Sequence, residues 1–320
     1  MASTGGQGRA AVVTGGAGFI GSHVVDALLA DGHNVVVVDD LSTGSPDNVA
    51  PEADLEVVDI SDRPALDRVM DSARPSVIFH LGAQSSVTVS VTDPERDCDV
   101  NVHGTLNVLE AAKRRGAPVS FTSTGGALYG NNAPIPTTEG QPPAPISPYG
   151  ASKWAGEAYV NTWREAGGPP HSVCRLGNVY GPRQSPHGEA GVVAIFSYLL
   201  WSDQAPKLFG YGVPTRDYVH VTDVARALIA AIGKGGTFNV STGVETPVIR
   251  ILELLQEIAG TSVEPELCPL RPGELERSCM SPERARQVLG WQPEYSLEDG
   301  LRETYQSLVE GFQAKAVSES

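Results

Sequence analysis

Two residue types that can move a proton together stand close in the chain. Tyr149 and Lys153 are four residues apart, and Ser123-Thr124 precedes them. On a helix this spacing places Tyr and Lys on one face, where the Lys ammonium favours the ionised form of the phenol. A phenolate accepts a proton from a sugar or alcohol hydroxyl, and a Thr hydroxyl can hydrogen-bond the same oxygen. The spacing by itself is common, so its meaning depends on the surrounding elements.

A glycine-rich turn lies near the amino terminus. The apolar run 11–14 is followed by Gly15, Gly18 and Gly21, and a helical apolar pattern continues over 20–32. In such a turn Gly15 closes the bend, Gly18 lets the backbone approach a diphosphate, and Gly21 allows close helix–strand packing. The amino terminus of the helix supplies N–H donors for phosphates. The spacing is GxxGxxG, and it predicts a dinucleotide site.

Acidic residues follow the next two strand-like runs. The run 34–38 ends at Asp39-Asp40, and no Arg stands within several residues of Asp39. A carboxylate at this position suits a ribose hydroxyl pair and favours NAD over NADP; the alternative is an ordinary acid at a strand end. Asp59 and Ile60 end the following run, where they could meet adenine.

Composition limits the class of protein. The 320 residues carry a formal net charge of −15, which argues against nucleic acid and against an anionic membrane surface as partners. Cysteines 98, 174, 268 and 279 lack metal-ligand spacing and are expected to be free, buried thiols; no metal site is predicted.

Residues 1–9 are polar and expected to be disordered. Without a signal peptide or an apolar run of about 20 residues, a cytoplasmic location is the default.

Alternation of strands and helices predicts the fold class. Apolar runs at 11–14, 34–38, 55–58, 77–81, 119–123 and 172–176 are separated by helical stretches at 20–32, 64–72, 101–115 and 149–166. This order is typical of a Rossmann-type, doubly wound parallel sheet in an α/β fold. We expect an NAD-binding domain over 1–178, with a return near 216–243 at Phe238–Val240. A smaller substrate-binding lobe would cover most of 179–320, with helices at 190–202 and 249–259 and turns after the first of them.

The motifs together resemble the extended short-chain dehydrogenase/reductases, and within them the UDP-glucose 4-epimerase-like NAD-dependent epimerase/dehydratase family. The matching segments run nearly from end to end: GGAGFIGS (15–22), DDLSTG (39–44), HLGAQSSV (80–87), NVHGTLNVLEAA (101–112), FTSTGGALYG (121–130), SPYGASK (147–153), RLGNVYGPRQSPHGEAGVVAIF (175–196), RDYVHVTDVARA (216–227), FNVSTG (238–243) and RPGELERS (271–278).

This resemblance implies 4-epimerisation of a UDP-sugar, UDP-glucose or UDP-galactose, through a 4-keto sugar. Tyr149 would take the O4 proton while tightly bound NAD accepts hydride from C4. Thr124 would bind O4, and Lys153 would bind the nicotinamide ribose and lower the pKa of Tyr149. The cofactor set implied is Gly15, Gly18, Phe19, Ile20, Gly21, Asp39, Asp40, Ser42, Thr43, Gly44, Asp59, Ile60, Leu81, Gly82, Ala83, Asn101, Tyr149 and Lys153.

The resemblance also implies a substrate set. Its members are Ser85, Ser86, Thr124, Tyr149, Asn178, Val192, Arg216, Arg271, Glu274 and Ser278. Arg216 and Arg271 would neutralise the diphosphate and Asn178 would contact it; the alternative for Arg216 is a surface ion pair with Asp217. Glu274 stands where the family usually has Asp. Asn101 would brace the active site or cap a helix.

Two positions concern the choice of sugar. A bulky Tyr at the position of Ser278 excludes N-acetyl groups in the family, so the small Ser278 predicts that a UDP-N-acetylhexosamine is also accepted; the alternative is a surface serine without a role. Sugar 4,6-dehydratases carry Asp-Glu after the catalytic Thr, whereas this chain has Gly125-Gly126. We therefore favour an epimerase over a dehydratase.

Other functions remain open at this point. They are a UDP-uronic acid 4-epimerase using Ser85, Ser86 or Thr124 near C6, a net oxidoreductase that releases NADH, and a regulator that only binds the dinucleotide. The resemblance implies a homodimer through helices near 101–115 and 149–166. Apolar residues at Leu106, Val108, Leu109, Ala155 and Val160 fit that interface and equally fit packing within one chain.

Overall fold

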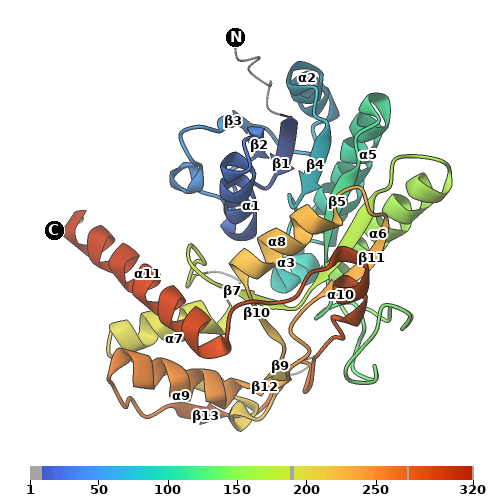
Figure 1. Ribbon diagram of the computed structural model, residues 1–320. Coiled ribbons are helices and arrows are strands. Elements are labelled where there is room, and N and C mark those ends of the chain that lie inside the picture. The colour runs from blue at the N-terminus through green and yellow to red at the C-terminus, as the bar shows by residue number, and fades with distance from the viewer. Residues whose placement is uncertain (1–8, 188–190, 272–273, 319–320) are drawn as a thin grey trace.

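A parallel sheet of seven strands forms the centre of the molecule (Figure 1). The computed structural model describes residues 9–187, 191–271 and 274–318, so of the segment expected to be disordered it covers only Arg9. The strand order is β11-β6-β5-β4-β1-β2-β3, which confirms the Rossmann-type fold. The strands are β1 (Ala10–Thr14), β2 (Asn34–Asp39), β3 (Asp54–Val57), β4 (Val77–His80), β5 (Val119–Thr124), β6 (Ser172–Leu176) and β11 (Gly236–Val240).

Helices cover both faces of this sheet because its strands are apolar on both sides. Successive side chains alternate, so Val13 packs toward one helical layer and Val12 toward the other. The first layer holds α1 (Phe19–Ala30), α8 (Val221–Ala231) and α10 (Glu283–Leu289); the second holds α2 (Arg63–Ala73), α5 (Gly104–Arg115) and α6 (Pro148–Glu165). The order reverses between β1 and β4, and ligands bind beyond the carboxyl ends of strands at such a point.

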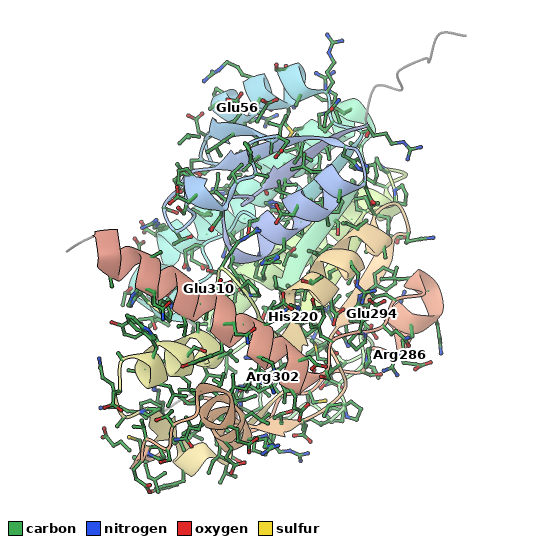
Figure 2. The ribbon with its side chains drawn as sticks, turned by 60° about the vertical axis from the view of Figure 1, so that its left-hand side comes forward. Glu56, His220, Arg286, Glu294, Arg302 and Glu310 are labelled. Carbon is green, nitrogen blue, oxygen red and sulfur yellow. The ribbon has the colours of Figure 1, made fainter. Side chains whose placement is uncertain are left out.

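A separate hydrophobic core lies beyond that edge of the sheet. It is built from α7 (Val192–Trp201), β8 (Lys207–Phe209), α9 (Val248–Ala259) and α11 (Leu297–Ser318). Figure 2 shows α11 running past the junction between the central sheet and this second core, with His220 near it. His220 stacks on Tyr295 with 3.9 Å between ring centroids. The short pairs are β7 (Asn178–Tyr180) with β10 (Tyr218–His220), β9 (Thr215–Arg216) with β12 (Thr246–Pro247), and β8 with β13 (Glu266–Cys268).

Several helices were not expected from the sequence. The sequence predicts turns after α7, yet α8 packs its Val224 and Leu228 into the core beside the sheet. The segment before Asn101 contains two short helices, α3 (Val87–Thr92) and α4 (Pro94–Cys98), capped by the Ser86 and Asp93 side chains. Side-chain caps of this kind supply the hydrogen bonds that short helices lack.

The expectation that all four cysteines are buried is partly wrong, and the structure places most of the apolar residues considered for an interface. Cys174 and Cys279 are buried, but Cys98 is exposed and Cys268 half-buried. Val108, Leu109 and Val160 are fully buried within the chain, so they contribute to its own core and are not free to form an interface. Leu106 and Ala155 keep partial exposure.

Candidate active site

The helix that carries Tyr149 starts at a tightly fixed position. Ser147 caps α6 by accepting a hydrogen bond from the Gly150 N–H, and Pro148 occupies the first turn, a position where its fixed φ is favourable. A Cβ on Gly150 would lie 2.4 Å from the Ala127 carbonyl oxygen. The first turn of α6 therefore packs directly against the loop that follows β5, which brings Tyr149 to Thr124.

Tyr149 and Thr124 share a hydrogen bond between their hydroxyl groups. Burial raises the pKa of Tyr149 to about 12, the nearby Asp97 also raises it, and the hydrogen bond with Thr124 lowers it. In the protein without ligands the phenol therefore keeps its proton at neutral pH. This is opposite to the lowering that was expected from Lys153, because desolvation is the largest effect.

Lys153 lies one helical turn further along α6, with its ammonium directed into the protein. Its Nζ donates a hydrogen bond to the Thr122 carbonyl oxygen at 2.9 Å and lies 4.9 Å from the centre of the Phe121 ring. Burial lowers the pKa of Lys153 to about 8, while Asp97 and Glu157 raise it. The pKa values of Tyr149 and Lys153 thus depend on charges that the sequence does not predict.

Asp97 is an acidic residue that the sequence analysis missed. Its side chain is 1% exposed, and its Oδ1 accepts hydrogen bonds from Gln84 Nε2 at 2.7 Å and from Asn101 Nδ2 at 3.1 Å. Asp97 and Asn101 are four residues apart, so a helical reading of this segment would have placed them together.

Asn101 braces this region and does not cap a helix. It lies inside a π-helical turn, η2 (Asp99–His103), that continues directly into α5, and such turns are common at functional sites. Its Nδ2 donates to the Gln84 carbonyl and to Ser152 Oγ, and its Oδ1 accepts from the Gln84 N–H. Ser152 in turn donates to the Tyr149 carbonyl. The loop after β4 and the Tyr149 turn are therefore linked.

The glycine turn fits the diphosphate of a dinucleotide. Gly15 has φ +70°, and a Cβ there would lie 2.7 Å from the Gly82 nitrogen; a Cβ on Gly21 would lie 2.0 Å from the Gly15 oxygen. Side chains are therefore excluded where the two loops meet. Gly18 begins α1 without a side chain that could cap it, so N–H groups of the first turn are available to an anion.

Asp39 stands at the end of β2, beside this turn. It is 7% exposed and accepts hydrogen bonds from the N–H groups of Ala17 and Leu41. Burial raises the pKa of Asp39, and the two backbone donors lower it. A Cβ on Gly44 would lie 2.9 Å from its Oδ1, so the 39–44 loop packs closely against the carboxylate and the glycine turn.

The other residues of the cofactor set follow neighbouring strands. Asp40 and Asp59 are both used in turns, accepting from the backbone and hydroxyl of Ser42 and of Ser61. Ile60 packs against Gly104. Phe19 and Ile20 form the first turn of α1, Thr43 lies between Ser42 and Gly44, and Leu81, Gly82 and Ala83 follow β4.

His80, which was also missed, connects the two loops of the cofactor set. Thr14 Oγ1 accepts from the Gly82 N–H and lies 2.7 Å from His80 Nδ1. His80 Nε2 lies 3.0 Å from Thr105 Oγ1, which donates to the Asn101 carbonyl. Thr105 therefore accepts from Nε2–H, and Thr14 donates to Nδ1. Burial lowers the pKa of His80 to about 3, so the ring is neutral.

Most residues of the substrate set follow β6 in the chain. Arg216 Nη2 lies 3.5 Å from Glu274 Oε1, and the second oxygen of Glu274 is buried without a hydrogen-bond partner. The Arg271 guanidinium lies 3.7 Å from the centre of the Phe209 ring, an aromatic surface that the sequence analysis did not identify. Ser278 donates its N–H to the Thr215 carbonyl. Asn178 begins β7, Val192 begins α7, and Ser85 precedes the Ser86 cap of α3.

Asp217 does not pair with Arg216 as the alternative reading proposed. Its side chain is 1% exposed and accepts hydrogen bonds from the backbone of Thr242 and Gly243 and from the Thr242 hydroxyl. The Met280 N–H also donates to it, at 3.3 Å. Asp217 therefore joins the segments that carry Arg216 and Ser278.

The described ranges offer neither a metal site nor a membrane span. They contain no group of three or more His, Cys, Asp or Glu residues arranged to hold a metal ion. No helix in them is long and apolar enough to cross a membrane.

The amino-acid sequence also matches a known protein family and its members. The sequence profile of the NAD dependent epimerase/dehydratase family matches residues 11–241. A UDP-glucose 4-epimerase of Mycolicibacterium smegmatis is 47% identical over 314 residues, covering 95% of this chain and 99% of that protein.

Solved structures agree with this match. A UDP-glucose 4-epimerase from Thermotoga maritima, crystallised with UDP-glucose, superposes with a TM-score of 0.92 at 44% identity, over 94% of this chain and 99% of its own. The Thermus thermophilus UDP-glucose 4-epimerase in complex with NAD gives 0.87 at 42% identity, over 93% and 98%.

Proposed function

Since this chain belongs to the NAD dependent epimerase/dehydratase family, we propose that it interconverts UDP-glucose and UDP-galactose by NAD-dependent epimerisation at C4. The observation that carries the proposal is the hydrogen-bonded Thr124–Tyr149 pair, with Lys153 buried one turn further along α6. The alignments with relatives named UDP-glucose 4-epimerase extend over nearly the whole of this chain.

Residues of the glycine turn and of the following loops would hold NAD. The first-turn N–H groups of α1 would bind its diphosphate, Asp39 a ribose, and Asp59 and Ile60 the adenine. When bound, NAD takes hydride from sugar C4 and returns it to the opposite face. The site then has to hold C4 in position for both transfers, so positioning contributes much of the catalysis.

Tyr149 would accept the O4 proton as the 4-keto sugar forms and return it when the hydroxyl is restored. Thr124, which already forms a hydrogen bond with the phenol, is placed to hydrogen-bond the same O4. Lys153 supplies a positive charge that favours the phenolate. With Tyr149 at a pKa of about 12 in the ligand-free chain, the phenol is kept protonated until the site is assembled.

Arg216 and Arg271 would bind the substrate diphosphate, together with Asn178. A planar guanidinium suits two phosphate oxygens at once. In the ligand-free chain Arg216 faces Glu274 and Arg271 faces the Phe209 ring. A bound diphosphate would replace these weaker contacts, and Glu274 would then be free to hydrogen-bond a ribose.

The packing at Gly125 supports an epimerase over a dehydratase. A Cβ on Gly125 would lie 1.9 Å from Met280 Sδ, so an acidic side chain cannot be added there unless Met280 moves. Gly125 and Gly126 therefore supply no acid–base pair for loss of water after Thr124, whereas return of the hydride needs none.

We also propose that Ser278 admits a 2-N-acetyl group. Ser278 lines one small cavity with Gly125, Gly126, Thr137 and Met280. Replacing Ser278 with Tyr should reduce turnover of UDP-N-acetylglucosamine by about tenfold or more, since a poor fit costs about 1–3 kcal/mol, and should spare UDP-glucose. Ser278→Ala is the control and should keep the wild-type ratio. Undetectable wild-type activity on UDP-N-acetylglucosamine would contradict this part.

A homodimer through α6 is a further part of the proposal. Trp154 and Tyr159 are 45% and 37% exposed on α6, and Val87 and Val91 are 41% and 63% exposed on the adjacent α3. Trp154→Glu should shift the protein from dimer to monomer in sedimentation velocity, because a charge would be buried in an apolar interface. Tyr211→Glu, at an exposed position in the other lobe, should leave the dimer intact. A monomeric wild type would refute the assignment.

The proposed activity can be tested with purified protein and no added cofactor. UDP-glucose, UDP-galactose, UDP-N-acetylglucosamine and UDP-glucuronic acid are incubated separately, and the products are resolved by chromatography. We expect UDP-glucose and UDP-galactose each to give the other. Conversion of UDP-glucuronic acid alone would favour a uronic acid epimerase, and release of a 4-keto product with NADH would favour a net oxidoreductase.

A further inference from the structure

Asp97 takes no direct part in the proposed reaction, yet it is buried beside the residues that carry that reaction. It belongs to α4, which packs against α6, and it affects the charge balance of both Tyr149 and Lys153. A carboxylate that is 1% exposed is costly to bury unless it is hydrogen-bonded or paired. Asp97 receives two side-chain donors and no Lys or Arg partner among the described residues.

Its two donors are residues that position other parts of the site. Gln84 also donates to the Ser86 carbonyl and accepts from the Ser86 N–H, which fixes the loop before α3. Asn101 donates hydrogen bonds to the Gln84 carbonyl in that loop and to Ser152 Oγ, and Ser152 donates to the Tyr149 carbonyl. Asp97 Oδ1 therefore fixes the side chains of Gln84 and Asn101, and Asn101 joins the loop after β4 to the first turn of α6.

Few other charged groups face the catalytic pair. Glu157 on α6 is bound by Arg175 of β6, with 2.6 Å between Arg175 Nη2 and Glu157 Oε2, so its charge is balanced. His80 of β4 is neutral, and β5 and α3 carry no ionisable side chain. Within the described part of the chain, no Lys, Arg or His forms an ion pair with Asp97 in the way that Arg175 pairs with Glu157.

We propose that Asp97 is a positioning residue of the active site, which fixes the Gln84–Asn101 contact and places one negative charge behind Tyr149 and Lys153. This inference rests on the proposed epimerase function. The negative charge keeps Lys153 in its ammonium form, and it keeps the proton on Tyr149 until the positive charge of the bound cofactor counteracts it.

Two substitutions separate the charge from the hydrogen bonds. Asp97→Asn keeps an oxygen of the same shape that can accept from Gln84 and Asn101, and removes the charge. Because the charge raises the pKa of Tyr149, its removal should move the acidic limb of the kcat/KM profile to lower pH. Asp97→Ala removes the acceptor as well, so it should also lower kcat and the amount of NAD that co-purifies, with little change in KM for UDP-glucose.

The matched control is Asp99→Asn, which removes one charge two residues away. Asp99 is exposed and pairs with His103, so its profile should coincide with the wild type; thermal melting checks that each variant is folded. A folded Asp97→Asn protein with an unshifted acidic limb would overturn the proposal. If the wild type itself does not epimerise a UDP-sugar, the proposed function fails and the Asp97 inference fails with it, which is a distinguishable outcome.

Discussion

Tyr149→Phe should lower kcat by about 10²–10⁴-fold, the usual contribution of a positioned acid–base group. The phenol oxygen is the atom that would accept the O4 proton, and Phe keeps the ring and its packing while removing that oxygen. The co-purified NAD should stay near wild-type content, because the glycine turn and Asp39 are untouched. Activity is measured as conversion of UDP-galactose, and NAD is released by acid and quantified.

Tyr159→Phe is the matched control for this substitution. Tyr159 lies on the same helix, is 37% exposed and makes an edge contact with Trp163. Its hydroxyl is not part of the proposed site, so kcat should not change. Full turnover by Tyr149→Phe would show that another group accepts the proton.

Glu157→Ala should lower the free energy of unfolding by about 3–5 kcal/mol, because it leaves the Arg175 charge buried without its partner. Arg175 donates to both carboxylate oxygens of Glu157, and both side chains are less than one-tenth exposed. Arg175 also donates to the Tyr129 hydroxyl, which donates to Asn239 Oδ1. The ion pair thus joins α6 to β6 and β11. Urea unfolding followed by circular dichroism gives the value.

Glu165→Ala provides the comparison for this prediction. Glu165 is 75% exposed and pairs with Arg164, and exposed pairs of this kind contribute about 0–1 kcal/mol. Equal stability losses in the two variants would contradict the importance assigned to the buried pair.

The sequence predicted the sheet well for physical reasons. Parallel strands buried on both faces appear as continuous apolar runs, so all six main strands and the return at Phe238 were identified. The Gly15–Gly21 turn was recognised because close backbone contacts exclude any side chain there.

Features fixed by distant contacts could not be predicted in the same way. The helices α3 and α4 are too short to show a period, and their caps depend on the tertiary position of Ser86 and Asp93. The burial of Asp97 and its effect on Tyr149 therefore stayed hidden. The pairing of Arg216 with Glu274 depends on residues far apart in the chain. The cytoplasmic location and the domain boundary at residue 178 stay predictions.

The most direct test of hydride removal and return at one carbon is epimerisation in D₂O. UDP-galactose is incubated with the protein in D₂O without added NAD, and the product is examined by proton NMR. If the hydride leaves C4 and returns to it within one site, the UDP-glucose formed carries protium at C4 and no NADH accumulates. Deuterium at C4 of the product would mean that a proton from solvent was exchanged there, and would contradict the mechanism.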